Sequence, residues 1–190
     1  ALLPGLRALV WEDALRDQVE RYIVDHPSST WTLNRAAHRF PAWLQARGAP
    51  VPQVELARLD VAVTTAFEAA EGVPLAPHEL AAMPPLRLQP HVALLRLTHD
   101  VHRFRSAVVG ERERPPVTAV DVPLVVFRRE RRMRHQVVDP VAFALLEHVQ
   151  AGRTVGEALL AVVADGADPA HLQENLGGWF RDFAAWVQAA

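Results

Sequence analysis

The sequence contains no cysteine and no lysine, and it has only one tyrosine and two methionines among its 190 residues. The absence of cysteine excludes disulfide bonds, thiolate nucleophiles and cysteine metal ligands. The absence of lysine makes all twenty basic residues arginine, which we attribute first to the codon usage of a GC-rich genome.

Long hydrophobic runs are also missing. No stretch of about eighteen apolar residues is present to span a bilayer, and no basic segment followed by an apolar core begins the chain. The sequence therefore predicts neither a membrane helix nor a signal peptide, and it favours a cytoplasmic protein. Half of the residues are nonetheless hydrophobic, which suffices for a packed core in one domain or two small ones.

Signatures of a self-contained active site are absent as well. The chain has no nucleophile elbow, phosphate-binding loop, dinucleotide fingerprint or HExxH motif. His91, His99 and His102 form the closest group of histidines, but no carboxylate completes a recognisable ligand spacing. We therefore expect a protein that is not an enzyme by itself and that binds no metal or other cofactor.

Charge is unevenly distributed, although the net charge is only −2. Residues 101–138 hold nine arginines against four acidic residues, which gives +5. Residues 139–190 hold two arginines against seven acidic residues, which gives −5. A generic nucleic-acid-binding domain is basic over its contact surface, so nucleic acid is not the partner that this chain favours.

The basic segment coincides with the clearest strand pattern in the chain. A β-branched and aromatic run extends from Val122 to Phe127, and apolar and polar residues then alternate from Met133 to Val138. The pattern predicts a β-hairpin over about 122–138. Five arginines within seven residues give one end of this hairpin a positive field: Arg128, Arg129, Arg131, Arg132 and Arg134.

Three interpretations of this hairpin surface follow from its charge. It is a solvated tip, or a sheet edge to which an extended peptide adds as a further strand while the arginines hold acidic side chains, or a surface that lies along phosphates. For the peptide interpretation the predicted binding residues are Val125, Phe127, Arg128, Arg129, Arg131, Arg132 and Arg134.

Helical patterns occupy most of the remaining chain. We expect a helical domain over 1–85, followed by a winged-helix-like α+β domain over 86–190 in which three helices follow the hairpin. The overall prediction is a mainly α, α+β fold. The start signals of the three helices are Asp139 with Pro140, the capping box of Thr154 and Glu157, and Asp168 with Pro169. The last apolar stripe is expected to continue as helix to Val187.

Several motifs together carry a resemblance to a known family. They are HPSSTWTLN (26–34), FPAWL (40–44), ELARLDVAVTTAFEAAEGVPL (55–75), LRLQPHVALLRLTHDVHRF (86–104), VVFRRERRMRHQVVDP (125–140) and GWFRDF (178–183). Their order resembles the HvfC/BufC family, whose members have also been described as DNA-binding domain proteins and to which MbnC-type partner subunits are related. Members usually carry further helical sequence before the stretch that matches residues 3–10.

The resemblance implies a two-domain partner subunit with no iron of its own. Proteins of this kind dock on a TIM-barrel enzyme with a multinuclear non-heme iron centre, and they help to present the leader of a ribosomally made precursor peptide for modification, as in methanobactin biosynthesis. We read the tryptophans as core or junction anchors, and for docking of the partner enzyme we single out Trp31, Phe40 and Trp43.

Two candidate functions follow from these patterns and from the resemblance. The first is the non-catalytic partner subunit, which forms a heterodimer with the iron oxygenase and receives the precursor peptide at the hairpin. The second is a transcriptional regulator in which the helix from Val155 or the helix from Pro169 enters the major groove and the hairpin acts as the wing. The sequence favours the first, because those helices offer few arginine, asparagine or glutamine side chains.

Overall fold

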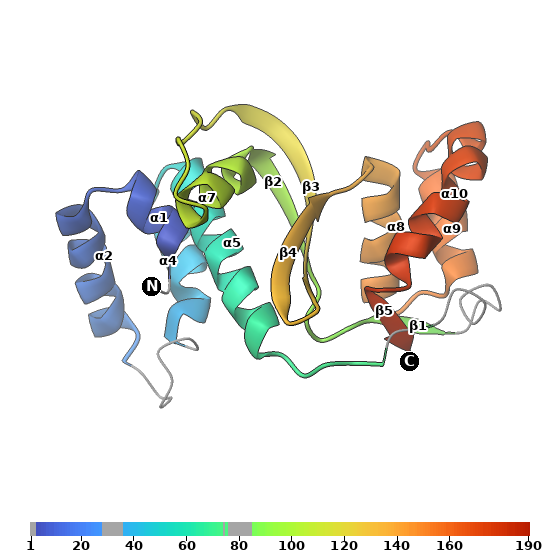
Figure 1. Ribbon diagram of the computed structural model, residues 1–190, viewed down its shortest axis with the longest axis horizontal. Helices are drawn as coiled ribbons and strands as arrows, with labels where there is room; N and C mark the ends of the chain where they lie inside the picture. The colour runs from blue at the N-terminus through green and yellow to red at the C-terminus, as the bar shows by residue number, and fades with distance from the viewer. Residues whose placement is uncertain (1–2, 28–35, 74, 76–84) are drawn as a thin grey trace. The chain divides into compact units, whose positions relative to one another are not determined.

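The computed structural model describes residues 3–27, 36–73, 75 and 85–190. Within this part the fold is α+β, with eight α-helices, 55% helical content and small antiparallel sheets (Figure 1). The predicted α+β class and hairpin are confirmed. No helix in these ranges combines the length and the apolar composition that crossing a bilayer requires.

The elements, in chain order, are α1 Pro4–Leu9, α2 Glu12–Asp25, the 3-10 helix η1 Ala37–Arg39, α4 Phe40–Ala46, α5 Val51–Glu68, β1 Leu86–Leu88, β2 Ala93–His99, α7 Val101–Val109, β3 Ala119–Arg129, β4 Arg132–Val137, α8 Pro140–Gln150, α9 Val155–Ala164, α10 Pro169–Phe183 and β5 Val187–Ala189.

The packing of the backbone divides the chain into two compact units. Unit 1 comprises Ala1–Thr65 and Leu97–Val122, and unit 2 comprises Ala66–Arg96 and Pro123–Ala190. Helix α5 and strands β2 and β3 each run from one unit into the other. The two domains expected from the sequence are divided after residue 85. The packing of the backbone does not test that division, so it stays a prediction.

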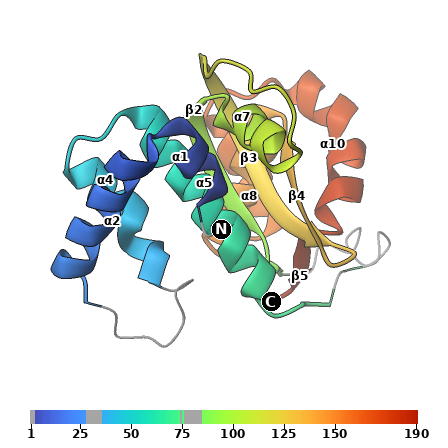
Figure 2. The same ribbon diagram turned by 60° about the vertical axis from the view of Figure 1, so that its left-hand side comes forward.

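The helices of unit 1 pack around an aromatic cluster. Phe40 is stacked on Trp43 with 5.7 Å between ring centroids, and Tyr22 meets both rings in a T-shaped arrangement at 5.0 and 5.8 Å. Pro41 lies in the first turn of α4, where a helix tolerates proline because that N–H has no intrahelical partner. Figures 1 and 2 show α2 beside α4, the two helices that this cluster joins.

A buried carboxylate ties α1 to α5 and α7 within unit 1. Asp60 is fully buried; its Oδ2 accepts the N–H groups of Gly5 and Leu6 at 2.9 and 3.0 Å, and its Oδ1 accepts Nε of Arg105 at 2.6 Å. A Cβ at Gly5 would lie 2.8 Å from Cδ2 of Leu56, so α1 can approach this closely only with glycine. Burial raises the pKa of Asp60, while Arg105 and the two N–H groups oppose that shift.

The three helices of unit 2 begin at the predicted capping residues. Asp139 accepts the N–H of Val141 at 2.8 Å, and Thr154 and Glu157 form the expected capping box. Asp168 caps α10 in the same way. These helices share one core with the hairpin and β1, and the least exposed members of that core are Val125, Phe143, Leu146, Ala142, Ala158 and Val187.

The last helix is shorter than its apolar pattern predicts. Helix α10 ends at Phe183, and Val187 instead pairs with Leu88 in the small sheet of β1 and β5. The side chain of Gln89 donates to the carbonyl of Val187 at 3.3 Å, and its N–H donates to the carbonyl of Trp186 at 2.8 Å. The prediction that Val187 is helical is therefore wrong. The backbone of this segment bonds instead to strand β1 and to Gln89, which lie far away in the sequence.

Candidate functional site

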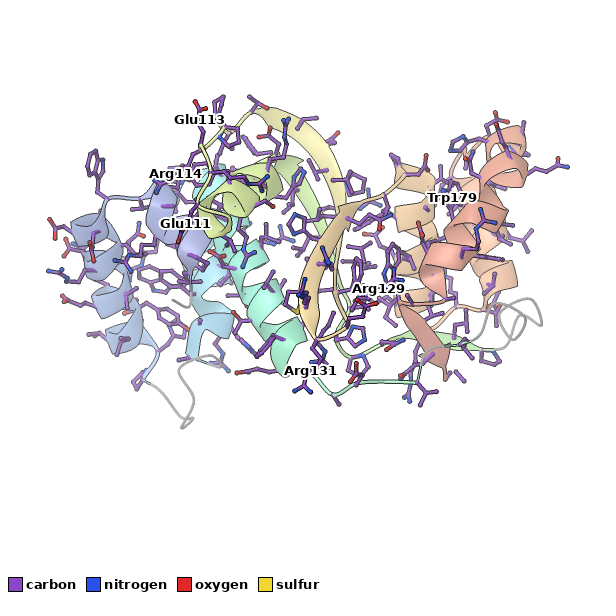
Figure 3. The ribbon with its side chains drawn as sticks, viewed as in Figure 1. Glu111, Glu113, Arg114, Arg129, Arg131 and Trp179 are labelled. Atoms are coloured by element: carbon purple, nitrogen blue, oxygen red, sulfur yellow. The ribbon has the colours of Figure 1, made fainter. Side chains whose placement is uncertain are left out.

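Strands β3 and β4 form a hairpin with a two-residue turn. Their pairing ends with Arg129 opposite Arg132, so only Glu130 and Arg131 remain in the turn. Both turn residues have positive φ, 52° and 61°, as a type I′ turn requires. Neither residue is glycine or asparagine, so each stores strain of roughly 1–3 kcal/mol. Figure 3 shows Arg131 at the tip of the hairpin.

The register of the hairpin sorts its arginines onto two faces. Residues directly opposite each other share a face. Arg129 and Arg132 therefore lie on one face together with Arg134, whereas Arg128 lies on the other. We call Arg129, Arg132 and Arg134 the basic face. All three are exposed, and no acidic side chain in the described part of the chain pairs with them.

Arg128 has a structural role that the sequence did not indicate. Its guanidinium donates to the carbonyls of Phe67 at 2.7 Å and Ala66 at 3.5 Å, at the C-terminal end of α5, where a cation stabilises the helix dipole. Its backbone N–H donates to Nδ1 of His91 at 3.3 Å. Burial lowers the pKa of His91, and the nearby Arg128 charge lowers it further, so the neutral ring is the form that accepts this bond.

The outer edge of β4 faces away from β3. Strand β4 is the last strand of the β2-β3-β4 sheet in the described ranges. The N–H of Val138 donates to the carbonyl of Pro123 at 3.0 Å, and hydrogen-bonded pairs alternate along an antiparallel ladder. The backbone groups of Arg134 therefore point toward β3, and those of Met133, His135 and Val137 point away from it. We call the outward N–H and C=O groups of Met133, His135 and Val137 the outer edge.

The two sides of the outer edge differ in chemistry. On one side lies the basic face, followed by Gln136, whose amide donates to the Asp182 carboxylate of α10 at 3.2 Å. On the other side lie the side chains of Met133, His135 and Val137, of which Val137 is 49% exposed. We call these three residues the mixed side.

Two of the predicted peptide-binding residues are buried. Val125 is fully buried and Phe127 is 7% exposed, and both belong to the core of unit 2, where Phe127 lies 5.3 Å from the Trp186 ring. Strand β3 also has a neighbour on each side, β2 and β4, so it has no edge to offer. Val125 and Phe127 are therefore core residues, and their predicted contact with a peptide stays a prediction.

Two of the residues predicted to dock a partner enzyme are buried. Phe40 is 1% exposed and Trp43 is 8% exposed, because both fill the aromatic cluster of unit 1. The indole N–H of Trp43 donates to Asp25 at 2.7 Å, and this bond, together with Arg47, lowers the pKa of Asp25. Phe40 and Trp43 are therefore core residues, and their predicted contact with a partner stays a prediction. Trp31 lies outside the described residues.

Unit 1 exposes other large apolar side chains that the sequence analysis did not select. Trp11, which precedes α2, is 88% exposed, and Ile23 and Val24 near the end of α2 are 54% and 78% exposed. The signal for Trp11 was its position at the N-cap of the helix, where a side chain is not held by the apolar stripe. Figure 1 shows α2 along its length.

Three histidines of the described residues serve as local hydrogen-bonding partners. His99 Nδ1 lies 3.3 Å from Oε2 of Glu55, and His171 Nε2 lies 2.9 Å from Oδ2 of Asp139, which links α10 to the start of α8. His91 contacts Arg128, as described above. In the parts of the chain that the structure covers, no three histidine, aspartate or glutamate side chains are grouped as metal ligands.

In sequence, the chain matches no protein-family model and no curated protein. Arguments about function therefore rest on the hairpin, with its outer edge and basic face.

Proposed function

We propose that this chain is a non-catalytic partner subunit that presents an extended precursor peptide to a separate oxidative enzyme. The observation that carries the proposal is the outer edge of β4 beside three exposed arginines with no acidic partner in the described ranges. Charged side chains beside an edge strand discourage pairing with strands of like charge, and these arginines favour an acidic partner strand. The resemblance to the HvfC/BufC family supports the same role.

In this proposal the redox chemistry belongs to the partner. The partner is a TIM-barrel oxygenase with a multinuclear iron centre, and the two proteins form a heterodimer in the cytoplasm. The hairpin and helices α8, α9 and α10 act as a winged-helix-like domain that receives the peptide leader. This chain binds no iron and supplies position: pairing the leader with β4 holds the modified segment near the partner's iron and raises its effective concentration there.

The rival role, a DNA-binding regulator, finds less support in the same elements. A recognition helix reads bases with arginine, lysine, asparagine or glutamine side chains. Helix α9 has the sequence VGEALLAVVA, which contains none of them. Helix α10 carries Gln173 and Asn175 in its N-terminal half, of which Asn175 donates to the carbonyl of His171 at 2.9 Å, and its one arginine, Arg181, lies near the C-terminal end, whereas a recognition helix usually contacts bases from its N-terminal part.

The test combines association with a charge-reversal variant. The chain and a TIM-barrel iron oxygenase from its genomic neighbourhood, if that neighbourhood encodes one, should form a complex at micromolar concentration in sedimentation velocity, and the complex should capture the precursor peptide. Arg129→Glu together with Arg132→Glu should weaken peptide capture and leave the complex with the oxygenase intact. Arg103→Glu with Arg153→Glu, two exposed arginines outside the hairpin, is the matched control. Failure of the two proteins to associate, or turnover by this chain alone, would refute the proposal.

A further inference from the structure

Unit 1 contains a groove between its two sequence segments. Helix α1 and the residues that follow it form one wall, and the end of α7 with the loop after it forms the other. The volume of the groove is about 860 Å³, within the range of pockets that proteins use for binding. Its described lining residues all belong to unit 1, so the groove is a property of that unit alone. We call it the unit 1 groove.

Trp11 projects from the rim of the unit 1 groove without filling it. It is one of the lining residues, yet it is 88% exposed. The groove beside it is lined in part by apolar residues: Pro4, Ala8, Val10 and Val108. An enclosed tryptophan buries about 150–250 Å², and tryptophan is enriched among the residues that carry most of the binding energy at interfaces. The patch therefore offers both a projecting ring and an apolar hollow that could enclose one.

The charged residues of the groove carry both signs in equal number. Arg7 and Glu12 pair with each other at 3.2 Å, so their charges are balanced within the chain. Arg114 and Glu111 also line the groove, and none of the ion pairs among the described residues involves either of them. Arg114 donates to the carbonyl of Ala8 at 3.4 Å, and Figure 3 shows it with Glu111 beside α1 and α7. One cation and one anion of the groove thus remain for a partner.

Glu111 stands where a helix usually ends with glycine. Helix α7 ends in a Schellman motif, in which the N–H of Arg112 bonds to the carbonyl of Ala107 at 2.8 Å and Glu111 has a φ of 51°. This left-handed conformation disfavours any residue with a Cβ, and such strained residues cluster at binding sites. The chain therefore carries a charged side chain beside the groove at a position where glycine would be less strained.

We infer that the unit 1 groove receives Trp11 of a second copy of this chain, in a two-fold symmetric dimer. A two-fold interface uses the same patch on both copies, so the patch must be complementary to itself. This patch combines a projecting ring with a hollow, and Arg114 of each copy can pair with Glu111 of the other. A partner of one charge sign, such as a nucleic acid, would leave one of these two charges unpaired. The inference goes beyond the proposed function, whose hairpin residues belong to unit 2.

Sedimentation velocity of the full chain tests the dimer. Dimers should form in the micromolar range, and Trp11→Ala should raise the dissociation constant by about thirtyfold or more, as truncation of an interface hot spot does. Val24→Ala is the matched control, because Val24 is 78% exposed on α2 and is not a lining residue of the groove. A chain that stays monomeric up to millimolar concentration, or a Trp11→Ala variant that dimerises like the parent, would overturn the inference.

Charge reversal tests whether the partner is a second copy. Glu111→Arg and Arg114→Glu should each weaken the dimer, because every pair across the two-fold axis then joins like charges. An equimolar mixture of the two variants should restore the dimer, since each copy then meets the opposite charge on the other. Circular dichroism of each variant verifies that it is folded. Folded variants that remain monomeric when mixed would overturn the inference.

A glycine variant separates loss of the contact from loss of the fold. Glu111→Gly should raise the midpoint of thermal unfolding at concentrations where the chain is monomeric, because glycine adopts the left-handed conformation at lower cost. It should also weaken the dimer by about tenfold, the loss expected from one charge-assisted contact. A more stable variant that dimerises as tightly as the parent would overturn the inference.

The competing occupant of the groove is the iron oxygenase of the proposed function. If Trp11→Ala abolishes the complex with that enzyme while the parent chain alone is monomeric, the groove serves the heterodimer and the inference is overturned. A Trp11→Ala chain that is monomeric but still binds the oxygenase supports the inference.

Discussion

At the scale of single residues, Asp60 stabilises the N-terminal part of unit 1. Its carboxylate is fully buried and bonds to Arg105 and to the N–H groups of Gly5 and Leu6. Asp60→Ala removes one partner of a buried ion pair and leaves the other groups without an acceptor. The free energy of unfolding should fall by about 3–5 kcal/mol, measured by urea denaturation.

The control for this prediction removes the charge on both sides. Asp60→Leu with Arg105→Met replaces the pair by apolar side chains, so no ionised group remains buried alone. This double variant should lose less stability than Asp60→Ala does. A loss below about 1 kcal/mol for Asp60→Ala, within the range of an exposed ion pair, would contradict the role assigned to Asp60.

His91 makes the hairpin sensitive to acid. Its pKa in the folded chain is lower than the value of 6.5 in the unfolded chain, chiefly because of burial. As the pH falls below that value, the unfolded chain binds a proton before the folded chain does, so the free energy of unfolding falls. The stabilisation that neutral His91 provides is complete at pH values above the pKa of His91 in the unfolded chain. It is lost as the pH falls through the pKa of His91 in the folded chain.

His91→Asn keeps an acceptor near the position of Nδ1 and removes the titrating group. Its free energy of unfolding should vary less with pH between about 7 and 5 than that of the parent chain. His38→Asn, at an exposed histidine, is the control and should follow the parent profile. Parallel pH profiles for His91→Asn and the parent would show that His91 does not cause the dependence.

At the scale of elements, the hairpin turn is strained. Glu130 and Arg131 both occupy the left-handed region, which asparagine and glycine adopt at lower cost. Glu130→Asn with Arg131→Gly should therefore raise the free energy of unfolding by about 1–2 kcal/mol, measured by thermal or urea denaturation. If Arg131 contributes to the site, peptide affinity should fall although stability rises. An unchanged or lower stability would contradict the strain.

Elements with local start signals could be predicted from the sequence, and elements that depend on distant partners could not. The caps at Asp139 and Thr154 involve residues within three positions, and the structure confirms both. Asp100 also precedes a helix, but its carboxylate makes no cap and instead accepts the N–H of Thr118 at 2.7 Å. Helix α5 begins at Val51, and Pro52 fits the first turn of this helix.

The candidate site was predicted in part for the same reason. Alternation along the sequence predicts which side chains share a face of β4, and the register confirms it for Met133 and Arg134. The side on which Arg128 falls, and its bonds to the end of α5, depend on an element some sixty residues earlier in the chain. Burial of Val125 and Phe127 likewise reflects β2 and the helices of unit 2, which a β-branched run does not reveal.

At the scale of the whole molecule, the charge pattern of the chain agrees with the proposed role. The segment 101–138, with a net charge of +5, includes the hairpin, and the segment 139–190, with −5, forms the three helices that follow it. A basic hairpin followed by acidic helices suits capture of an acidic extended peptide better than contact with a nucleic acid, which would require a basic surface on the helices as well.

The most direct test of strand addition is amide hydrogen exchange, followed residue by residue by NMR, with and without the precursor peptide. The amides of Met133 and Val137 point outward in the free chain, so the peptide should slow their exchange strongly. The amides of Arg132 and Arg134 already bond to β3 and should change little. Unchanged exchange at Met133 and Val137 under saturating peptide would contradict the account.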